Sequence, residues 1–113
     1  MLAGTYRQLR KFTRGLEGVE VHHLIKKRFR ALFNVTPGKF LSMALTDEMH
    51  QIITNRWRNL DKVNDIFKEF VYGGNYSEIT YELMVQAVEE VYKDMPDVLR
   101  ATLEWLEANW KGK

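Results

Sequence analysis

The three histidines are the residues of this chain whose types and spacing best suit metal or acid–base chemistry. His22 and His23 are adjacent in the stretch EVHHLIKKRF, and His50 stands alone further along the chain. A neutral imidazole binds divalent metal ions, and its pKa near neutrality also suits it to moving protons. The sequence contains no cysteine, so thiolate metal sites and disulfide bonds are excluded. These histidines therefore form the first candidate site.

The elements around the doublet suggest how its two rings divide their work. The β-branched stretch GVEV, residues 18–21, predicts a strand that runs into the histidines. Successive strand residues point to opposite faces, so His22 and His23 are poorly placed to ligate one ion together. One ring is expected to bind a metal while the other acts nearby. FLSMAL, residues 40–45, predicts a second strand, and His50 then falls in the first turn of the following helix.

A lone histidine beside a strand is more often a packed or surface residue than a ligand. Three histidines in one strand–strand–helix arrangement favour a site. A closed structural zinc site requires four ligands, and the remaining ones are not evident in the sequence. An open site, with water or phosphate completing the shell, fits the residues better.

Helical apolar spacing recurs along the rest of the chain. A short helix is expected before residue 15, a second directly after the doublet, and four more from residue 47 onward. Thr46 and Thr80 are good N-caps, Pro96 is typical of a first helical turn, and turns are expected over 34–39 and 72–77. The apolar stripes are Tyr6, Leu9, Phe12 and Leu16; Ile25, Phe29, Leu32 and Phe33; Met49, Ile53, Trp57 and Leu60; Val63, Ile66, Phe67, Phe70 and Val71; Met84, Ala87, Val88, Val91 and Met95; and Leu99, Leu103, Leu106 and Trp110.

Composition and charge indicate one globular domain over residues 1–113 with two unlike halves. The chain is 45% hydrophobic and 28% charged, and no apolar run approaches the length of a bilayer span or of a signal-peptide core. A soluble protein is therefore expected. Residues 1–60 carry eleven Lys and Arg against four Asp and Glu, whereas residues 61–113 carry six against eleven. This polarity predicts a basic working part for a polyanion and an acidic helical buttress.

Two separated segments carry a resemblance to a known family. EVHHLIKKRF followed by MALTDEMHQIITNRWRN resembles the His-His toxin nucleases of the HNH, or ββα-metal (His-Me finger), superfamily. These domains commonly form the toxic C-terminal domains of bacterial polymorphic toxins. The stretch ITYELMVQAVEEVYKDMPDVL is similar to their helical extensions. The resemblance implies an α+β, mostly helical fold. A ββα-metal hairpin-plus-helix core would occupy residues 1–60 and a C-terminal helical extension residues 61–113.

The same resemblance implies roles for the histidines. His22, the first of the doublet, and His50 on the helix would ligate the metal, while His23 would act as the general base. Many relatives carry a second histidine one helical turn after the first, where this chain has Thr54. The third ligand is thus open between Thr54 and its neighbour Asn55. The asparagine that usually orients the base has no evident counterpart in this chain.

Two further groups of residues were assigned beside the histidines. Glu20 lies on the same strand face as His22 and is expected to orient it or to serve as the third ligand; the ordinary alternative is a solvated strand glutamate. The basic residues near the two motifs are expected to bind phosphate, although such runs are often only the solvent-exposed face of an amphipathic helix. These predicted phosphate ligands are Lys27, Arg28, Arg56 and Arg58, within the wider run that includes Lys26 and Arg30.

The function implied is a metal-dependent endonuclease with little sequence preference, with DNA favoured as the substrate and RNA left open. It would use one divalent ion, Mg²⁺ or Zn²⁺, with Mn²⁺ or Ni²⁺ as alternatives. The implied setting is a bacterial toxin domain that reaches a target-cell cytoplasm and is neutralised by an acidic immunity protein; otherwise a cytoplasmic protein is expected. Two alternatives remain open: a catalytically decayed nucleic-acid-binding module of the same fold, and a helical interaction domain without nucleic-acid function.

Overall fold

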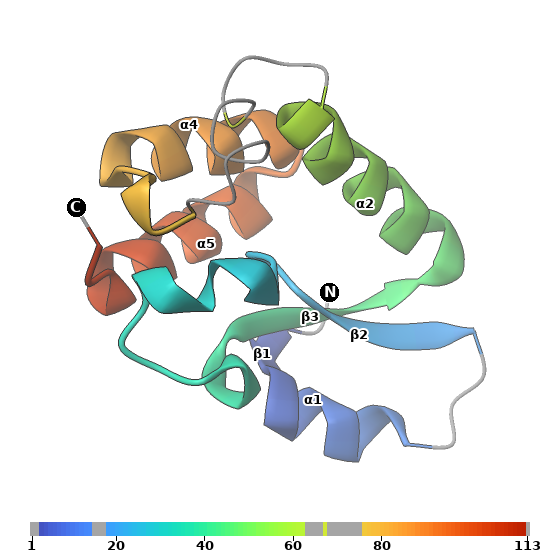
Figure 1. Cartoon of the computed structure of the whole chain (residues 1–113). Coiled ribbons are helices and arrows are strands. Elements are labelled where there is room, and N and C mark those ends of the chain that lie inside the picture. Colours follow the sequence, from blue (N-terminus) through green and yellow to red (C-terminus); the bar gives the residue numbers. More distant parts are fainter. Residues whose placement is uncertain (1–2, 15–17, 63–66, 68–75, 113) are drawn as a thin grey trace.

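The chain folds into helices around a small antiparallel sheet (Figure 1). The computed structural model describes residues 3–14, 18–62, 67 and 76–112. The strands are β1 (Ala3–Thr5), β2 (Val19–His23) and β3 (Leu41–Thr46), and the α-helices are α1 (Tyr6–Thr13), α2 (Asp47–Lys62), α4 (Tyr81–Val91) and α5 (Pro96–Asn109). Short 3₁₀ helices occur at Lys27–Leu32, Pro37–Lys39 and Tyr76–Glu78. The predicted α+β class is confirmed.

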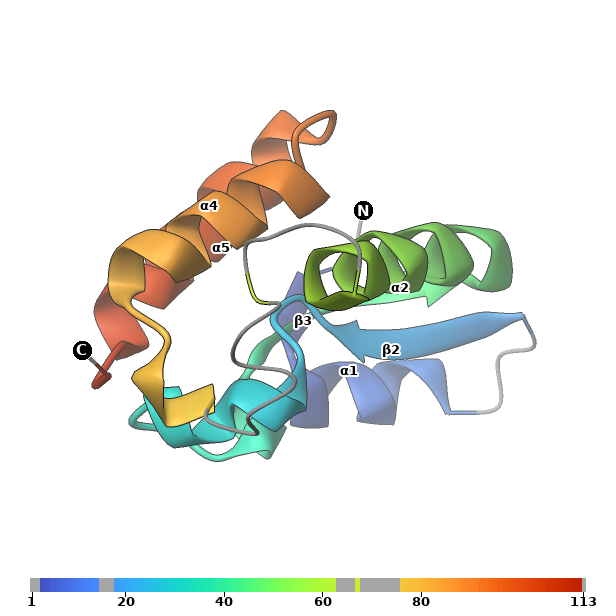
Figure 2. The same cartoon turned by 45° about the horizontal axis from the view of Figure 1, so that its top comes forward.

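The three strands are arranged in the order β1-β3-β2, so β2 lies at one edge of the sheet. It pairs antiparallel with the central strand β3, with His22 opposite Met43 and His23 opposite Ser42. The sheet lies between α1 on one face and α2 on the other, as Figures 1 and 2 show from two directions. The two faces of β2 therefore meet two different helices.

One predicted element differs from the structure, one strand was not predicted, and one predicted helix falls mostly on residues that the structure does not describe. The helix expected directly after the doublet is instead the 3₁₀ helix Lys27–Leu32. Its buried residues Phe29 and Leu32 are three positions apart, which is the repeat of a 3₁₀ turn. Strand β1 was not predicted, because three residues are too few to show an alternating pattern. The helix expected over residues 63–71 lies outside the described residues except for Phe67, which is buried.

The helix starts follow local capping chemistry. The Thr46 hydroxyl accepts a hydrogen bond from the Met49 amide at 3.3 Å, and the Thr80 hydroxyl accepts one from Leu83 at 3.2 Å. Both predicted N-caps are confirmed, and Pro96 begins α5 as expected. An unpredicted capping box between Thr5 and Gln8 fixes the start of α1.

The stripes predicted for the last two helices are partly confirmed. In α4 the buried residues match the prediction, but the helix ends at Val91, so Met95 precedes α5 instead of extending α4. In α5 the most deeply buried residues are Val98, Thr102 and Leu106, whereas the predicted Leu99, Leu103 and Trp110 are only partly buried. The core-facing stripe of α5 is thus rotated by about one residue from the predicted one.

One cluster of buried apolar side chains packs α2 against the segments before it, from Leu24 to Leu45, and against the helices after it, α4 and α5. Trp57 of α2, Phe29 after the doublet, Phe40 before β3 and Tyr92 after α4 are all fully buried within it. The prediction that Trp57 belongs to the core is confirmed. Burial of these aromatic rings supplies much of the favourable free energy that holds α4 and α5 against α2 and the segment between β2 and β3.

Tyr92, in the acidic C-terminal part of the chain, makes a hydrogen bond just beyond the end of β2. Its hydroxyl donates a hydrogen bond to the carbonyl oxygen of Leu24, the residue directly after His23. Burial raises the pKa of Tyr92, so the phenol stays protonated and remains a donor at physiological pH. The second half of the chain therefore helps to position the candidate site.

Replacing Tyr92 with phenylalanine should destabilise the fold by about 1–3 kcal/mol, because the buried Leu24 carbonyl loses its side-chain donor. Urea unfolding measures this as a lower midpoint at an unchanged slope. Tyr81→Phe is a matched control, because Tyr81 is only partly buried at the opposite end of α4. An equal shift in both variants would contradict a specific role for the Tyr92 hydroxyl.

Candidate metal centre

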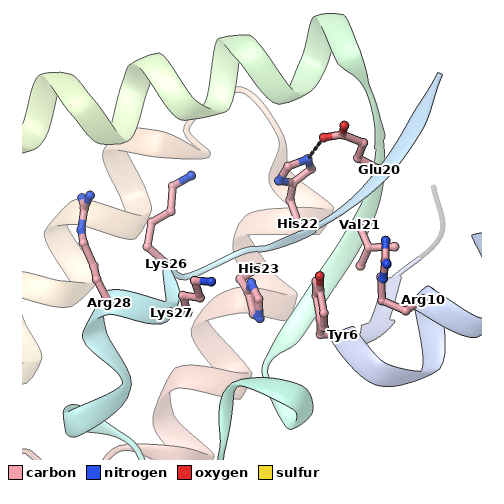
Figure 3. A pocket seen from close by; sticks show the side chains of 9 residues that line it. All are labelled: Tyr6, Arg10, Glu20, Val21, His22, His23, Lys26, Lys27 and Arg28. Atoms are coloured by element: carbon pink, nitrogen blue, oxygen red, sulfur yellow. Dashed lines mark hydrogen bonds and ion pairs between the residues drawn. The ribbon is translucent and has the colours of Figure 1, made fainter.

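The two histidines of the doublet point to opposite sides of β2, as the sequence predicted (Figure 3). His22 faces α2, where its ring stacks on that of His50. His23 faces α1, where its ring stacks on that of Tyr6. The pleat of one short strand thus gives the two adjacent rings separate surroundings.

His22, His50 and Glu20 form one cluster on the α2 side of the sheet. The ring centroids of His22 and His50 lie 3.4 Å apart with planes inclined by 19°. The Oε2 atom of Glu20 lies 3.2 Å from Nε2 of His22 and 3.6 Å from Nδ1 of His50. One potential ligand atom from each residue lies within 4.8 Å of the others. The structure thus brings together both predicted histidine ligands and one of the three candidates for the third.

The surroundings of His22 favour a neutral ring. Burial lowers the pKa of His22, and the neighbouring His50 lowers it further. Glu20 opposes these effects, because its carboxylate accepts a hydrogen bond from the ring and attracts positive charge. The side chains of His22 and Glu20 are 19% and 58% exposed, so the cluster opens to solvent on the carboxylate side. A neutral, partly accessible imidazole is the form that binds metal ions.

His23 is held by three groups that none of the sequence patterns identified. Its ring lies parallel to that of Tyr6, with centroids 4.3 Å apart and planes inclined by 8°. The Phe40 ring meets it edge-on at 5.7 Å. Its Nε2 atom donates a hydrogen bond to the carbonyl oxygen of Pro37 at 3.1 Å. These contacts fix both the plane and the rotation of the imidazole.

The bond to Pro37 also decides which ring nitrogen of His23 can take up a proton. A carbonyl oxygen only accepts, so Nε2 carries the hydrogen and Nδ1 keeps its lone pair in the neutral ring. Burial lowers the pKa of His23, the Pro37 carbonyl raises it, and the nearby Lys27 and Lys26 lower it again. The neutral ring therefore predominates at physiological pH, with Nδ1 able to accept a proton.

Both histidines of the doublet border one groove of about 520 Å³ along the edge of the sheet (Figure 3). Four cations and a single carboxylate line it, so its charge suits an anionic ligand. The lining residues are Tyr6, Arg10, Glu20, Val21, His22, His23, Lys26, Lys27 and Arg28. The two sides of the doublet are thus reached from the same opening.

The four predicted phosphate ligands have different places. Lys27 and Arg28 line the groove, and the Arg28 guanidinium lies over the Phe29 ring at 5.0 Å. Arg58 is exposed on α2. Arg56 donates to both carboxylate oxygens of Asp94, at 2.8 and 2.9 Å, and to the Val91 carbonyl at 2.8 Å. These contacts favour a structural role for Arg56 at the turn between α4 and α5.

The pair of Arg56 and Asp94 predicts a pH-dependent part of the stability. The hydrogen bonds from Arg56 lower the pKa of Asp94, so the folded chain binds this proton less tightly than the unfolded chain. The stabilisation is therefore present above the ordinary aspartate pKa of about 3.9 and is lost as the pH falls through the lower, folded value.

Urea midpoints of the wild type and Asp94→Asn, compared over an acid pH series, measure this contribution. We expect the wild type to be more stable near neutral pH and the difference to vanish in strong acid. Asp97→Asn is a matched control, because Asp97 pairs with the exposed Arg100 one turn later in α5. A difference between wild type and Asp94→Asn that persists at the lowest pH would contradict the assignment.

The other two candidates for the third ligand lie on α2. Thr54 is one helical turn after His50, and its hydroxyl is buried without a hydrogen-bond partner within the described part of the chain. Such an unsatisfied hydroxyl is unusual and is available to a ligand. Asn55 is exposed on α2. Thr54 is therefore the better candidate of the two, while Glu20 already touches His22.

Sequence reasoning missed Tyr6 and Arg10 as residues of the site. They are four positions apart on α1, and both line the groove beside His23. The available signal was a helix with three cations and no acid, but only the three-dimensional placement of α1 under β2 connects it with the doublet.

Comparison of the chain with protein-family models, curated proteins and solved structures finds no match. Among the described residues no helix combines the length and apolar character needed to cross a bilayer. A function for this chain is therefore inferred from the geometry of the site itself.

Proposed function

We propose that this protein is a metal-dependent endonuclease of the HNH, ββα-metal type, which hydrolyses phosphodiester bonds with little sequence preference. The observation that carries the proposal is the cluster of Glu20, His22 and His50, of which Glu20 and His22 line the same cation-lined groove as His23. The order β2, β3, α2 that presents these residues agrees with the strand–strand–helix order of that superfamily.

Glu20, His22 and His50 would hold one divalent ion, with the unsatisfied Thr54 hydroxyl as a further candidate ligand. Two imidazoles and a carboxylate suit Zn²⁺, Mn²⁺ or Ni²⁺, and Mg²⁺ if water completes the shell. Ligation through Nε2 requires the neutral His22 ring to carry its hydrogen on Nδ1 instead of donating it to Glu20. Protonation of the imidazoles in acid would compete with the ion, so metal affinity should rise with pH. A bound ion would stabilise the charge that develops on the phosphate and the departing oxygen.

His23 would act as the general base. Its Nδ1 atom takes a proton from the attacking water, while Pro37 and Tyr6 keep the ring in place. The Pro37 carbonyl would thereby orient the His23 ring, the task that the resemblance gives to an asparagine without a counterpart in this chain. Lys27 and Arg28 would hold the phosphate chain by contacts that carry no sequence information.

The basic groove supports a polyanion as the substrate class, of which DNA is the one proposed. An acidic immunity protein that covers the same cations would inhibit the enzyme. In this proposal the chain is a bacterial toxin domain that acts in the cytoplasm of a target cell.

Purified protein incubated with plasmid DNA and with a structured RNA tests the proposal, with Mg²⁺, Mn²⁺, Zn²⁺ or Ni²⁺ and with a chelator as control. Chelator-sensitive cutting of DNA is expected, and its absence with every ion would contradict the nuclease.

A second candidate is a nucleic-acid-binding module with a decayed site. The observation that favours it is the close stacking of His22 and His50, whose nearly parallel planes do not direct their lone pairs to one point. Ligation of one ion by both rings requires the planes to open. Salt-sensitive DNA binding without cleavage under any metal would identify this second candidate.

A further inference from the structure

We propose that Arg10 and Lys27 bind the phosphates that flank the phosphodiester bond facing His23, so that the substrate is the interior of a polynucleotide strand. This inference rests on the proposed function and adds α1 to the binding surface. It assigns Arg10 a role in binding that the resemblance in the sequence did not supply.

The charge of the N-terminal part of the chain supports this binding surface. Residues 1–46 contain nine Lys and Arg but only two acids, Glu17 and Glu20. Within α1 every charged side chain is positive. Among the described residues, Glu20 is the single carboxylate that lines the groove with four cations, and it contacts His22 on the α2 side of β2.

Tyr6 determines where Arg10 lies. The Tyr6 amide donates to the Phe40 carbonyl at 3.0 Å, and its ring stacks on His23, so the start of α1 is fixed against the doublet. Arg10 follows four residues later on the same helix face, about 5–6 Å away between Cβ atoms. In Figure 3 Lys27 and Arg10 stand on either side of the stacked pair of His23 and Tyr6.

Neither Arg10 nor Lys27 forms an ion pair within the described ranges of the chain. By contrast Arg56 and Arg100 are both paired with aspartates. Cations that border a groove without a protein counter-charge suit a polyanion that supplies two charges, one on each side of His23. A small diester has no flanking phosphates, so it would lie beside His23 without contacting Arg10 or Lys27.

The test compares Arg10→Gln and Lys27→Gln with Lys11→Gln, a matched control on the same helix that does not line the groove. Each protein is assayed on a short DNA duplex and on bis(4-nitrophenyl) phosphate, a diester without neighbouring phosphates. We expect kcat/KM for DNA to fall about tenfold in the two groove variants, one lost contact each, and that for the small diester to change less than about twofold. Thermal unfolding verifies that each variant is folded.

Binding of a fluorescein-labelled DNA duplex under chelator provides a second readout that needs no catalysis. The slope of log affinity against log salt should lose about 1 in each groove variant and about 2 in the double variant, but little in Lys11→Gln. Equal losses in Lys11→Gln, an equal loss on the small diester, or unchanged slopes would overturn the inference.

The proposed function and the inference can fail separately. If the wild type hydrolyses neither substrate, the nuclease is wrong, and the binding slopes still decide whether Arg10 and Lys27 contact phosphates. If it hydrolyses both but the slopes are unaltered, the nuclease stands and this binding surface is wrong. If the labelled duplex shows no salt-dependent binding, the inference is overturned.

Discussion

In the proposed nuclease, replacing His23 with alanine should lower metal-dependent DNA cleavage by about 10²–10⁴-fold, the usual range for loss of a general base. His23 is the residue of the doublet whose ring is held by Tyr6 and Pro37 on the face of β2 away from the cluster of Glu20, His22 and His50. The same substitution should leave metal binding intact, because the Glu20, His22 and His50 cluster lies on the other face of β2.

Added imidazole separates a chemical role of His23 from a structural one. A free imidazole that enters the gap left by His23→Ala can accept the proton and should restore part of the cleavage, whereas it cannot repair a misfolded site. The pH dependence of the rescued cleavage should follow the pKa of the added imidazole instead of that of His23. Wild-type rates in His23→Ala would exclude this residue as the base, and unrescued loss together with a lowered unfolding temperature would reassign it to packing.

Divalent ions should raise the unfolding temperature of the wild-type protein, and this gain should depend on Glu20, His22 and His50. At a free metal concentration one hundred times the Kd, binding to the folded state alone adds about 2.7 kcal/mol, which corresponds to roughly 10 °C for a domain of this size. A chelator should reverse the shift.

Single substitutions identify the ligands in the same measurement. We expect His22→Ala and His50→Ala to abolish the metal-dependent shift and Glu20→Gln to reduce it, because each removes an atom of the cluster. Thr54→Val tests the unsatisfied hydroxyl at nearly constant volume. His23→Ala is the matched control and should keep the full shift. A shift that survives the double variant of His22 and His50 would place the ion elsewhere.

The parts of this structure that depend on local sequence were predictable. The N-caps at Thr46 and Thr80 and the buried stripe of α2 follow from patterns within one helical turn or a few. The approach of His22 to His50 was also predictable, because strand alternation and helix position together restrict the side on which each ring lies.

The parts that depend on distant contacts were not predictable. Three residues of β1, too short to show a pattern, place α1 under the sheet and thereby bring Tyr6 to His23. Arg56 looked like a phosphate ligand from its position in the motif, but its carboxylate partner is 38 residues away in the chain. A single sequence does not contain the geometry of such pairs.

The edge position of β2 determines how a long polymer could reach the doublet. Because β3 pairs with only one side of β2 and β1 lies beyond β3, no further described strand closes the outer flank of the histidines. A strand of DNA would therefore enter the groove of the proposed nuclease from the side, without a free end to be threaded. In the proposed nuclease, a covalently closed circle should be cut per bond as readily as a linear molecule of the same sequence.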